Sequence, residues 1–155
     1  MKDVSVDNID RQILRTLQND GSLSMAALAA VVGASTASCW RRVRSLEAAG
    51  ILGRTVRLVD AHKVHRGVNV MCQVRLKSHA PESRRGIERL LESHEEIMEC
   101  YSMSGEWDYL LRIVVADIEE YERFLMKHVL SHESVATVAS NFALSQLKYS
   151  TSLPV

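Results

Sequence analysis

Apolar residues recur every three or four positions over the first fifty residues and are interrupted by turn residues. This pattern predicts three helices, over residues 6–19, 24–33 and 35–50, with Gly33 at a point where a helix C-terminus favours positive φ. Two short helices cannot bury their own apolar stripes, so the first helix has to pack across the other two. Two helices joined by a short glycine turn have the spacing of a helix-turn-helix.

The third predicted helix has two different faces. Cys39, Val43 and Leu46 share an apolar face, with Trp40 at the edge of the core, and arginines and hydroxyls fall on the opposite side. Arginine can bond guanine edges or phosphates, and short hydroxyls let a helix approach the groove floor. The predicted DNA-contacting residues are Ser35, Thr36, Ser38, Arg41, Arg42, Arg44 and Ser45. The alternative is an ordinary amphipathic helix with a solvated basic face, but the helix-turn-helix spacing favours DNA binding.

Beyond residue 66 the pattern alternates between strand and helix. One helix begins with Pro81 in its first turn, and another is capped by Asp117. Strands are predicted over residues 67–77, 97–103 and 107–115, with a last extended segment over 134–149. The order β-α-β-β-α-β predicts an α+β, ferredoxin-like domain whose antiparallel sheet carries both helices on one side. The other face has to be covered, most simply by a second copy of the chain, which predicts a homodimer.

The segment between the two halves predicts a domain boundary. Residues 54–59 alternate as a short strand with Val56 and Leu58 on one face, which makes the first domain winged-helix-like. Residues 60–66 are polar and lack periodicity, as a linker would. We therefore expect a helix-turn-helix domain over residues 1–60 and a second domain over residues 61–155.

A glycine-bearing turn before the third strand of the second domain is a candidate ligand site. Gly105 permits close backbone approach, so main-chain N–H groups can point at a carboxylate. Asp108 offers an anion for an α-amino group, and Ser104 or Tyr109 offers a hydroxyl. An amino acid needs this pairing of donors with an acceptor, whereas the alternative is a plain hairpin turn. The candidate effector-binding residues are Ser104, Gly105, Asp108 and Tyr109, with Ser140 and Asn141 from the last strand.

Composition and charge narrow the possible functions. The 155 residues balance 19 Lys and Arg against 19 Asp and Glu, but five of the positive charges lie between Arg41 and Arg57, in and just after the predicted DNA-contacting helix. No apolar run approaches the length of a membrane span, and the first ten residues are too polar for a signal peptide. We therefore expect a cytoplasmic protein with no membrane partner. The three scattered cysteines predict neither a disulfide framework nor a zinc site.

No set of side chains predicts catalysis, a metal or a cofactor. His62 and His65, like His128 and His132, have metal-compatible spacing, but no cysteine or paired carboxylate completes either pair. The sequence contains no phosphate-binding loop, nucleophile elbow or triad-like set, and no separated acid pair of the kind that acid-base catalysis requires. We expect a protein that is not an enzyme.

Four motifs in order resemble one family along the whole chain. They comprise Asp7, Asp10, Ile13, Leu14, Leu17, Gln18, Asp20 and Gly21; Cys39 to Val43 with Leu46, Glu47, Gly50 and Ile51; Ser104 and Gly105 with Asp108 to Leu111; and Phe142, Leu144 and Gln146 to Tyr149. Each motif alone is weakly specific, but four at this spacing are together specific. On them the chain resembles the Lrp/AsnC, or feast/famine, transcriptional regulators.

The resemblance implies a DNA-binding domain joined by a hinge to a ligand-sensing and oligomerisation domain. It implies dimers that assemble further, commonly to octamers, on double-stranded DNA. It also implies a small effector, an amino acid, held where subunits meet and near the loop over residues 104–109. A different function remains open: a stand-alone metabolite-binding module or enzyme whose helical appendage docks on a protein. Exposed Arg41 and Arg42 would favour DNA binding, because a protein-docking helix exposes apolar anchors instead.

Overall fold

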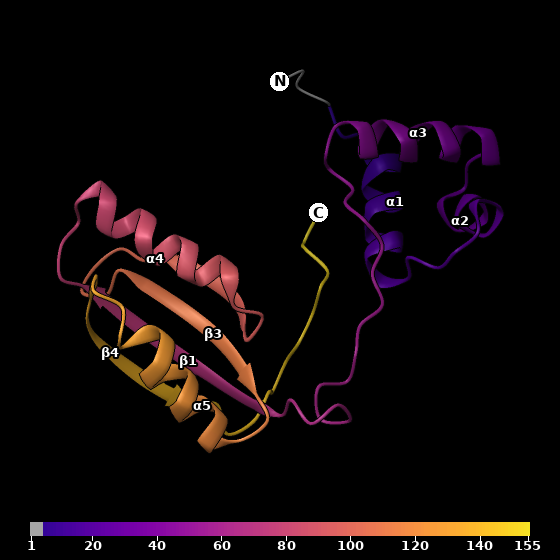
Figure 1. Ribbon diagram of the computed structural model, residues 1–155. Coiled ribbons are helices and arrows are strands. Elements are labelled where there is room, and N and C mark those ends of the chain that lie inside the picture. Colours follow the sequence, from indigo (N-terminus) through magenta and orange to yellow (C-terminus); the bar gives the residue numbers. More distant parts are fainter. Residues whose placement is uncertain (1–4) are drawn as a thin grey trace. The chain divides into compact units, whose positions relative to one another are not determined.

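The computed structural model describes residues 5–155 and consists of two compact units (Figure 1). One unit contains the chain up to Leu58 together with Leu147–Val155, and the other contains Val59–Gln146. The division between Leu58 and Val59 lies close to the expected boundary at residue 60. The last nine residues, which the sequence assigned to the second domain, are grouped with the first. Residues 1–4 of the expected first domain lie outside the described residues.

Three helices build the N-terminal unit, and capping residues in the sequence set where each begins. They are α1 (Asn8–Asn19), α2 (Met25–Val32) and α3 (Thr36–Ala48). The side chains of Ser24 and Ser35 accept hydrogen bonds from backbone N–H groups in the first turns of α2 and α3. Gly33 ends α2 with φ at 67°, in the left-handed region that glycine enters without strain. The helix-turn-helix prediction is confirmed.

The core of this unit comes from the apolar stripes that the sequence pattern identified. Ile13 and Leu28 are fully buried, and Cys39 on α3 packs with them. The complete set of buried core residues is Ile13, Leu14, Leu28, Ala29, Val32, Cys39, Val43 and Leu46. Because all three helices contribute, the position of α3 depends on its packing against both α1 and α2.

The strand predicted over residues 54–59 is absent. The segment is extended, but in the described residues it pairs with no other strand. Alternation alone was insufficient because a strand needs a hydrogen-bonded neighbour. Val56, Leu58 and Val59 are 59%, 64% and 70% exposed, so these side chains are largely uncovered by the rest of residues 5–155.

The last residues of the chain lie along α1 within the N-terminal unit. Gln18 bonds the Leu153 backbone twice: its Oε1 accepts from the Leu153 N–H at 2.6 Å, and its Nε2 donates to the Leu153 carbonyl at 3.3 Å. Arg15 donates to the Val155 carbonyl, and the Val155 side chain packs against the helical core. The predicted final extended segment, residues 134–149, therefore forms a strand only over Val135–Phe142, and the contacts with α1 come from residues after it.

The C-terminal unit has the predicted β-α-β-β-α-β order. Its elements are β1 (Val68–Leu76), α4 (Pro81–Ser93), β2 (Ile97–Ser102), β3 (Tyr109–Val115), α5 (Ile118–Phe124), which continues as one π-helical turn (Leu125–Val129), and β4 (Val135–Phe142). All pairings are antiparallel, and the strand order is β2-β3-β1-β4. The predicted ferredoxin-like topology is confirmed.

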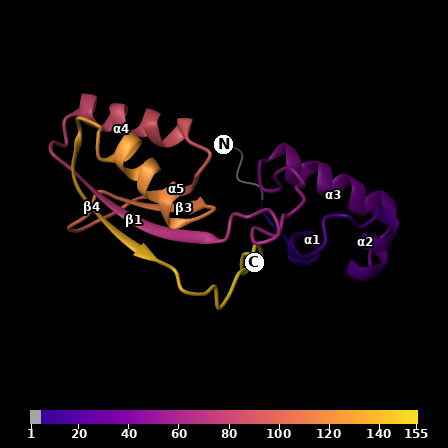
Figure 2. The same cartoon turned by 60° about the horizontal axis from the view of Figure 1, so that its bottom comes forward.

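Both helices of this unit cover the same face of the sheet (Figure 2). Alternate residues of the two central strands point into this layer, so Val70, Cys72 and Val74 on β1 are fully buried, and Leu111 and Ile113 on β3 pack beside them. The residues between them face the other way and are only partly covered. One face of the sheet is therefore left uncovered by the helices of this unit.

Candidate DNA-binding and effector sites

The exposed side of α3 carries two arginines. Arg41 and Arg44 are exposed, as are Ser45 and the two residues that open the helix, Ser35 and Thr36. Ser38 is half-buried, and its backbone N–H donates to the Ser35 cap at 3.2 Å. These side chains lie opposite the buried stripe, so they are available to an external partner.

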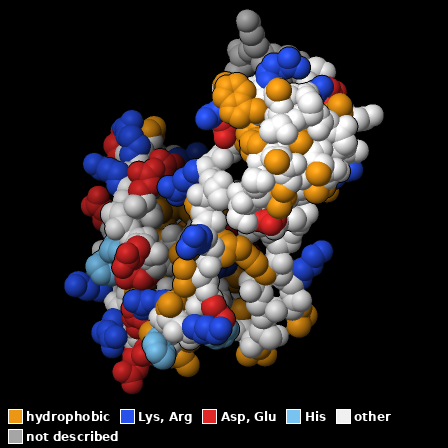
Figure 3. All heavy atoms as spheres, turned by 90° about the vertical axis from the view of Figure 1, so that its right-hand side faces the viewer, with side chains coloured by type: hydrophobic (Ala, Val, Ile, Leu, Met, Phe, Trp, Pro, Cys, Tyr) orange, Lys and Arg blue, Asp and Glu red, His pale blue; other side chains and the backbone are white. Residues whose placement is uncertain are grey.

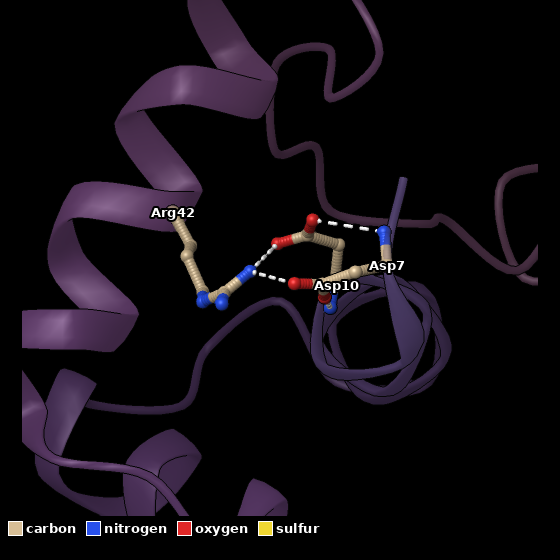
Figure 4. Close-up of polar contacts among 3 residues, drawn as sticks. All are labelled: Asp7, Asp10 and Arg42. Carbon is tan, nitrogen blue, oxygen red and sulfur yellow. Dashed lines mark hydrogen bonds and ion pairs between the residues drawn. The ribbon is translucent and has the colours of Figure 1, made fainter. Parts of the chain in front are cut away.

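Arg42 does not lie on the exposed face of α3, so the prediction that its side chain faces DNA is corrected. Its Nη1 contacts Asp7 Oδ2 and Asp10 Oδ1, each at 2.7 Å, at the start of α1 (Figure 4). The reason is its place on the helix: Arg42 lies three residues after Cys39 and four before Leu46, both buried. It therefore borders the core and meets α1 instead of solvent. Its side chain is 24% exposed, and its Nε is buried without a hydrogen-bond partner among the described residues.

The two carboxylates that hold Arg42 also form the N-terminal cap of α1. Asp7 accepts from the Asp10 backbone N–H at 2.9 Å, and Asp10 accepts from the Asp7 N–H at 3.1 Å, a reciprocal capping box. The Asp10 backbone bond, followed by the Arg42 guanidinium, holds the pKa of Asp7 below its ordinary value. We call Asp7, Asp10 and Arg42 the helix clamp. It joins the start of α1 to the middle of α3.

Trp40 also departs from its expected position at the edge of the core. It is 54% exposed, and the Arg44 guanidinium lies over its ring, 5.6 Å from the centroid. Arg44 is bonded in turn to Glu47 at 3.1 Å. The i,i+4 spacing of Trp40 and Arg44 is a signal that could have identified this pair from the sequence.

The glycine-bearing loop between β2 and β3 is a hairpin connection closed by backbone bonds. The Met103 N–H donates to the Asp108 carbonyl, and the Asp108 N–H donates to the Val74 carbonyl of β1, each at 2.9 Å. Gly105 has φ at 110°, which a residue with a side chain would adopt only under strain. Arg75 forms an ion pair with the Glu106 side chain. Ser104 and Gly105 are exposed at the tip.

The carboxylate of Asp108 already has partners. Its Oδ2 accepts from the Leu76 backbone N–H at 2.7 Å, and its Oδ1 lies 2.8 Å from His79 Nε2. The carboxylate is thus anchored at the end of β1, with its side chain 20% exposed. A ligand ammonium group would have to take the place of His79 or bind beside it.

Three of the six candidate effector residues do not reach this loop within one chain. Tyr109 is only 7% exposed and points into the layer under the helices, where burial raises its pKa. Ser140 shares a hydrogen bond with the Tyr121 hydroxyl, and Asn141 is paired with Met71 of β1. The loop end of the sheet is instead at Val74, which pairs with Tyr109. The alternation of side chains across the sheet turns Tyr109 away from Asp108. On β4, the residue level with the loop is Val138, which pairs with Val74, so Ser140 lies two residues further along the strand.

A polar network on the uncovered face of the sheet was not identified from the sequence. Arg112 on β3 bonds Glu99 on β2 at 2.7 Å and Asn69 on β1 at 3.1 Å. The Tyr101 hydroxyl donates to Glu99 at 2.7 Å, and this bond, with that of Arg112, lowers the pKa of Glu99. The charged pair of Arg112 and Glu99, extended to β1 by Asn69, makes this face of the sheet polar as well as apolar.

The paired histidines do not converge into a metal site in the described part of the chain. Among residues 5–155 no group of three or more His, Cys, Asp or Glu side chains is arranged to hold a metal ion. His128 lies against the His94 ring, with centroids 4.2 Å apart. Within the same residues, no helix combines the length and apolar character needed to cross a membrane.

Two family models match the chain, one over the N-terminal helices and one over the sheet and the residues that follow it. Residues 6–47 match the AsnC-type helix-turn-helix domain, and residues 69–153 match the Lrp/AsnC ligand binding domain. Among curated proteins, the chain is 37% identical over 150 residues to the DNA-binding transcriptional activator DecR of Escherichia coli, covering 97% of this chain and 99% of that protein. It is 36% identical over 150 residues to the glutamate uptake regulatory protein of Zymomonas mobilis, covering 97% and 91%.

Solved structures give the same result. A transcriptional regulator of Neisseria meningitidis in complex with L-Met has a TM-score of 0.93 at 31% identity, covering 97% of each chain. An AsnC family transcriptional regulator of Agrobacterium tumefaciens has a TM-score of 0.91 at 42% identity, covering 96% of each chain.

Proposed function

Because the chain belongs to the Lrp/AsnC family of DNA-binding transcriptional regulators, we propose that it binds specific DNA sequences through α3 and that an amino acid modulates this binding. The observation that carries the proposal is the pair of exposed arginines, Arg41 and Arg44, on the second helix of a helix-turn-helix. The regulator acts in the cytoplasm and catalyses no reaction. The competing function, a metabolite module with a protein-docking helix, is disfavoured because the exposed side of α3 carries Arg41 and Arg44, and its one exposed aromatic side chain, Trp40, lies under the Arg44 guanidinium.

Selection of duplexes from a random DNA pool tests the DNA-binding function. The chain should enrich one motif, and its affinity should fall steeply with salt, because Lys and Arg side chains displace counterions from phosphates. Enrichment of no motif, with salt-independent retention, would contradict sequence-specific DNA binding.

We infer a homodimer as the smallest functional unit, with further assembly to octamers. The dimer is supported by the sheet face that neither α4 nor α5 covers and by the extended segment over residues 54–59, which is unpaired among the described residues, and the octamer by membership of the family. Such a dimer should select an inverted repeat with half-sites separated by whole turns of DNA. Sedimentation equilibrium at micromolar concentration should show no stable monomer; a monomer there would refute the dimer.

We also propose that the effector binds at the loop carrying Ser104, Gly105 and Asp108, with subunit contacts completing the site. Support comes from the exposed Gly105 backbone beside an anchored carboxylate, and from the L-Met complex of the Neisseria relative. Tyr109, Ser140 and Asn141 take no part in the site within one chain. The effector must bind one arrangement of the protein better than another to change its affinity for DNA.

Asp108→Asn should abolish the response to the effector while preserving DNA binding without it. The amide oxygen can still accept from the Leu76 N–H, but the neutral side chain no longer attracts an α-ammonium group. Amino acids are first screened by thermal shift, since a ligand of the folded state raises its melting temperature. The best one is then titrated into the wild type, Asp108→Asn and, as the control, His79→Ala, which should still respond. Equal effector affinity in wild type and Asp108→Asn would remove Asp108 from the site.

A further inference from the structure

Trp40 is an exposed indole in the middle of the helix that carries the proposed DNA contacts. It lies four residues after Thr36 and four before Arg44, so the three side chains form one stripe along α3. Over half of the Trp40 surface is exposed, although tryptophan is usually well covered in folded proteins. Hydrophobic side chains and Lys and Arg side chains are exposed beside each other over the N-terminal unit in Figure 3.

The Arg44 guanidinium is held on two sides. Trp40 lies beneath it at 5.6 Å from the ring centroid, and Glu47 bonds its Nη1 at 3.1 Å. A guanidinium stacked on an aromatic ring loses less freedom when it binds a phosphate or a base, because its plane is already fixed. The Trp40 ring therefore serves as a platform for Arg44 as well as an apolar surface.

We propose that Trp40 is a specificity-determining residue that contacts the C5-methyl group of a thymine in the major groove. This proposal rests on the proposed DNA-binding function and deepens it. The occupant is DNA because arginines border the indole: Arg44 is stacked on it, and Arg41 follows it in the helix. Thymine is selected because its methyl group is the apolar group that base edges present in the major groove, and an indole has an apolar face to match it.

Replacing thymine by deoxyuridine tests this contact, since the change removes only the methyl group. In the duplex selected from the random pool, each thymine is replaced in turn and affinity is measured for wild type and Trp40→Ala. Replacement of one thymine per half-site should lower the affinity of the wild type about fourfold, which corresponds to the free energy of burying one methyl group. Trp40→Ala should bind the parent duplex more weakly and show no loss at that position.

Two further variants make the result specific to Trp40. Trp40→Phe keeps an aromatic face and should retain part of the thymine preference. This variant still tests the contact if Trp40→Ala fails to fold. Ile118→Ala removes another exposed apolar side chain, from α5, and should retain the full preference. The proposal is overturned if wild type tolerates every deoxyuridine, or if Trp40→Ala shows the same penalty as wild type. Failure of wild type to bind any duplex would instead contradict DNA binding itself.

Discussion

Replacing Arg42 with methionine is expected to lower the free energy of unfolding of the N-terminal unit by about 1–3 kcal/mol, the cost of losing hydrogen bonds to charged groups. Methionine keeps much of the apolar stem of arginine but leaves Asp7 and Asp10 without their shared partner. DNA affinity should fall as well, because α3 loses its tie to the start of α1. The measurement is denaturant unfolding, together with a salt titration of DNA binding.

Arg41→Met is the matched control for the helix clamp. It removes the same charge from the neighbouring residue of α3, where no bond within the described residues depends on it, so unfolding should be unchanged. A double-mutant cycle of Arg42→Met with Asp10→Asn should show coupling, since the two side chains share one ion pair. If Arg42→Met leaves stability unchanged but lowers the salt slope of DNA binding by about one unit, Arg42 is a phosphate contact and the clamp assignment is wrong.

Acid titration provides a second readout of the clamp. The pKa of Asp7 is lowered in the folded state by the Asp10 backbone bond and by Arg42. A carboxyl of this kind contributes stability above its unfolded pKa, and the contribution is lost as pH falls through the lower folded value. Arg42→Met should therefore make the acid-side loss of stability shallower, because the Asp7 pKa moves back toward that of the unfolded chain.

Local signals in the sequence specify most of the fold. The caps Ser24 and Ser35 and the left-handed Gly33 determine the helix-turn-helix, because each satisfies backbone groups within four residues of itself. Alternation likewise identifies β1 and β3, whose buried residues all face the helices. The segment over residues 54–59 and the tail on α1 could not be predicted this way. The segment lacks a pairing partner among the described residues. The tail depends on contacts with α1 between residues that are separated in the sequence by 135 positions in one case and 140 in the other.

The candidate sites were predicted less well, because side-chain direction decides them. Arg42 and Arg41 are adjacent in sequence, yet a step of about 100° turns one onto α1 and leaves the other exposed. The same limit applies to Tyr109, which follows Asp108 directly but points into the core. Ser140 was placed near the loop from its position on the last strand, but the strand register, which a single sequence does not reveal, engages it with Tyr121.

Arg41→Ala is expected to weaken binding to the selected duplex by about 5- to 150-fold, the equivalent of ~1–3 kcal/mol, without changing the unfolding transition. Arg41 is exposed on α3, and unlike Arg42 it makes no ion pair within residues 5–155, so its removal disturbs nothing else in the described chain. Fluorescence anisotropy with the parent duplex and its single-base variants measures the loss and shows its cause. A base contact should relax specificity at one base pair, whereas a phosphate contact should weaken all sequences equally and lower the salt slope by about one unit.

Arg89→Ala is the matched control for this prediction. It removes the same charge from an exposed position on α4, in the other unit, and should leave DNA affinity unchanged. Comparison of the two variants separates a contact of α3 from a general effect of lost positive charge, because long-range attraction of DNA depends on charge at any exposed position. If both variants weaken binding equally at every sequence, Arg41 contributes only net charge. If neither does, Arg41 makes no contact with DNA, and the prediction for this residue is wrong.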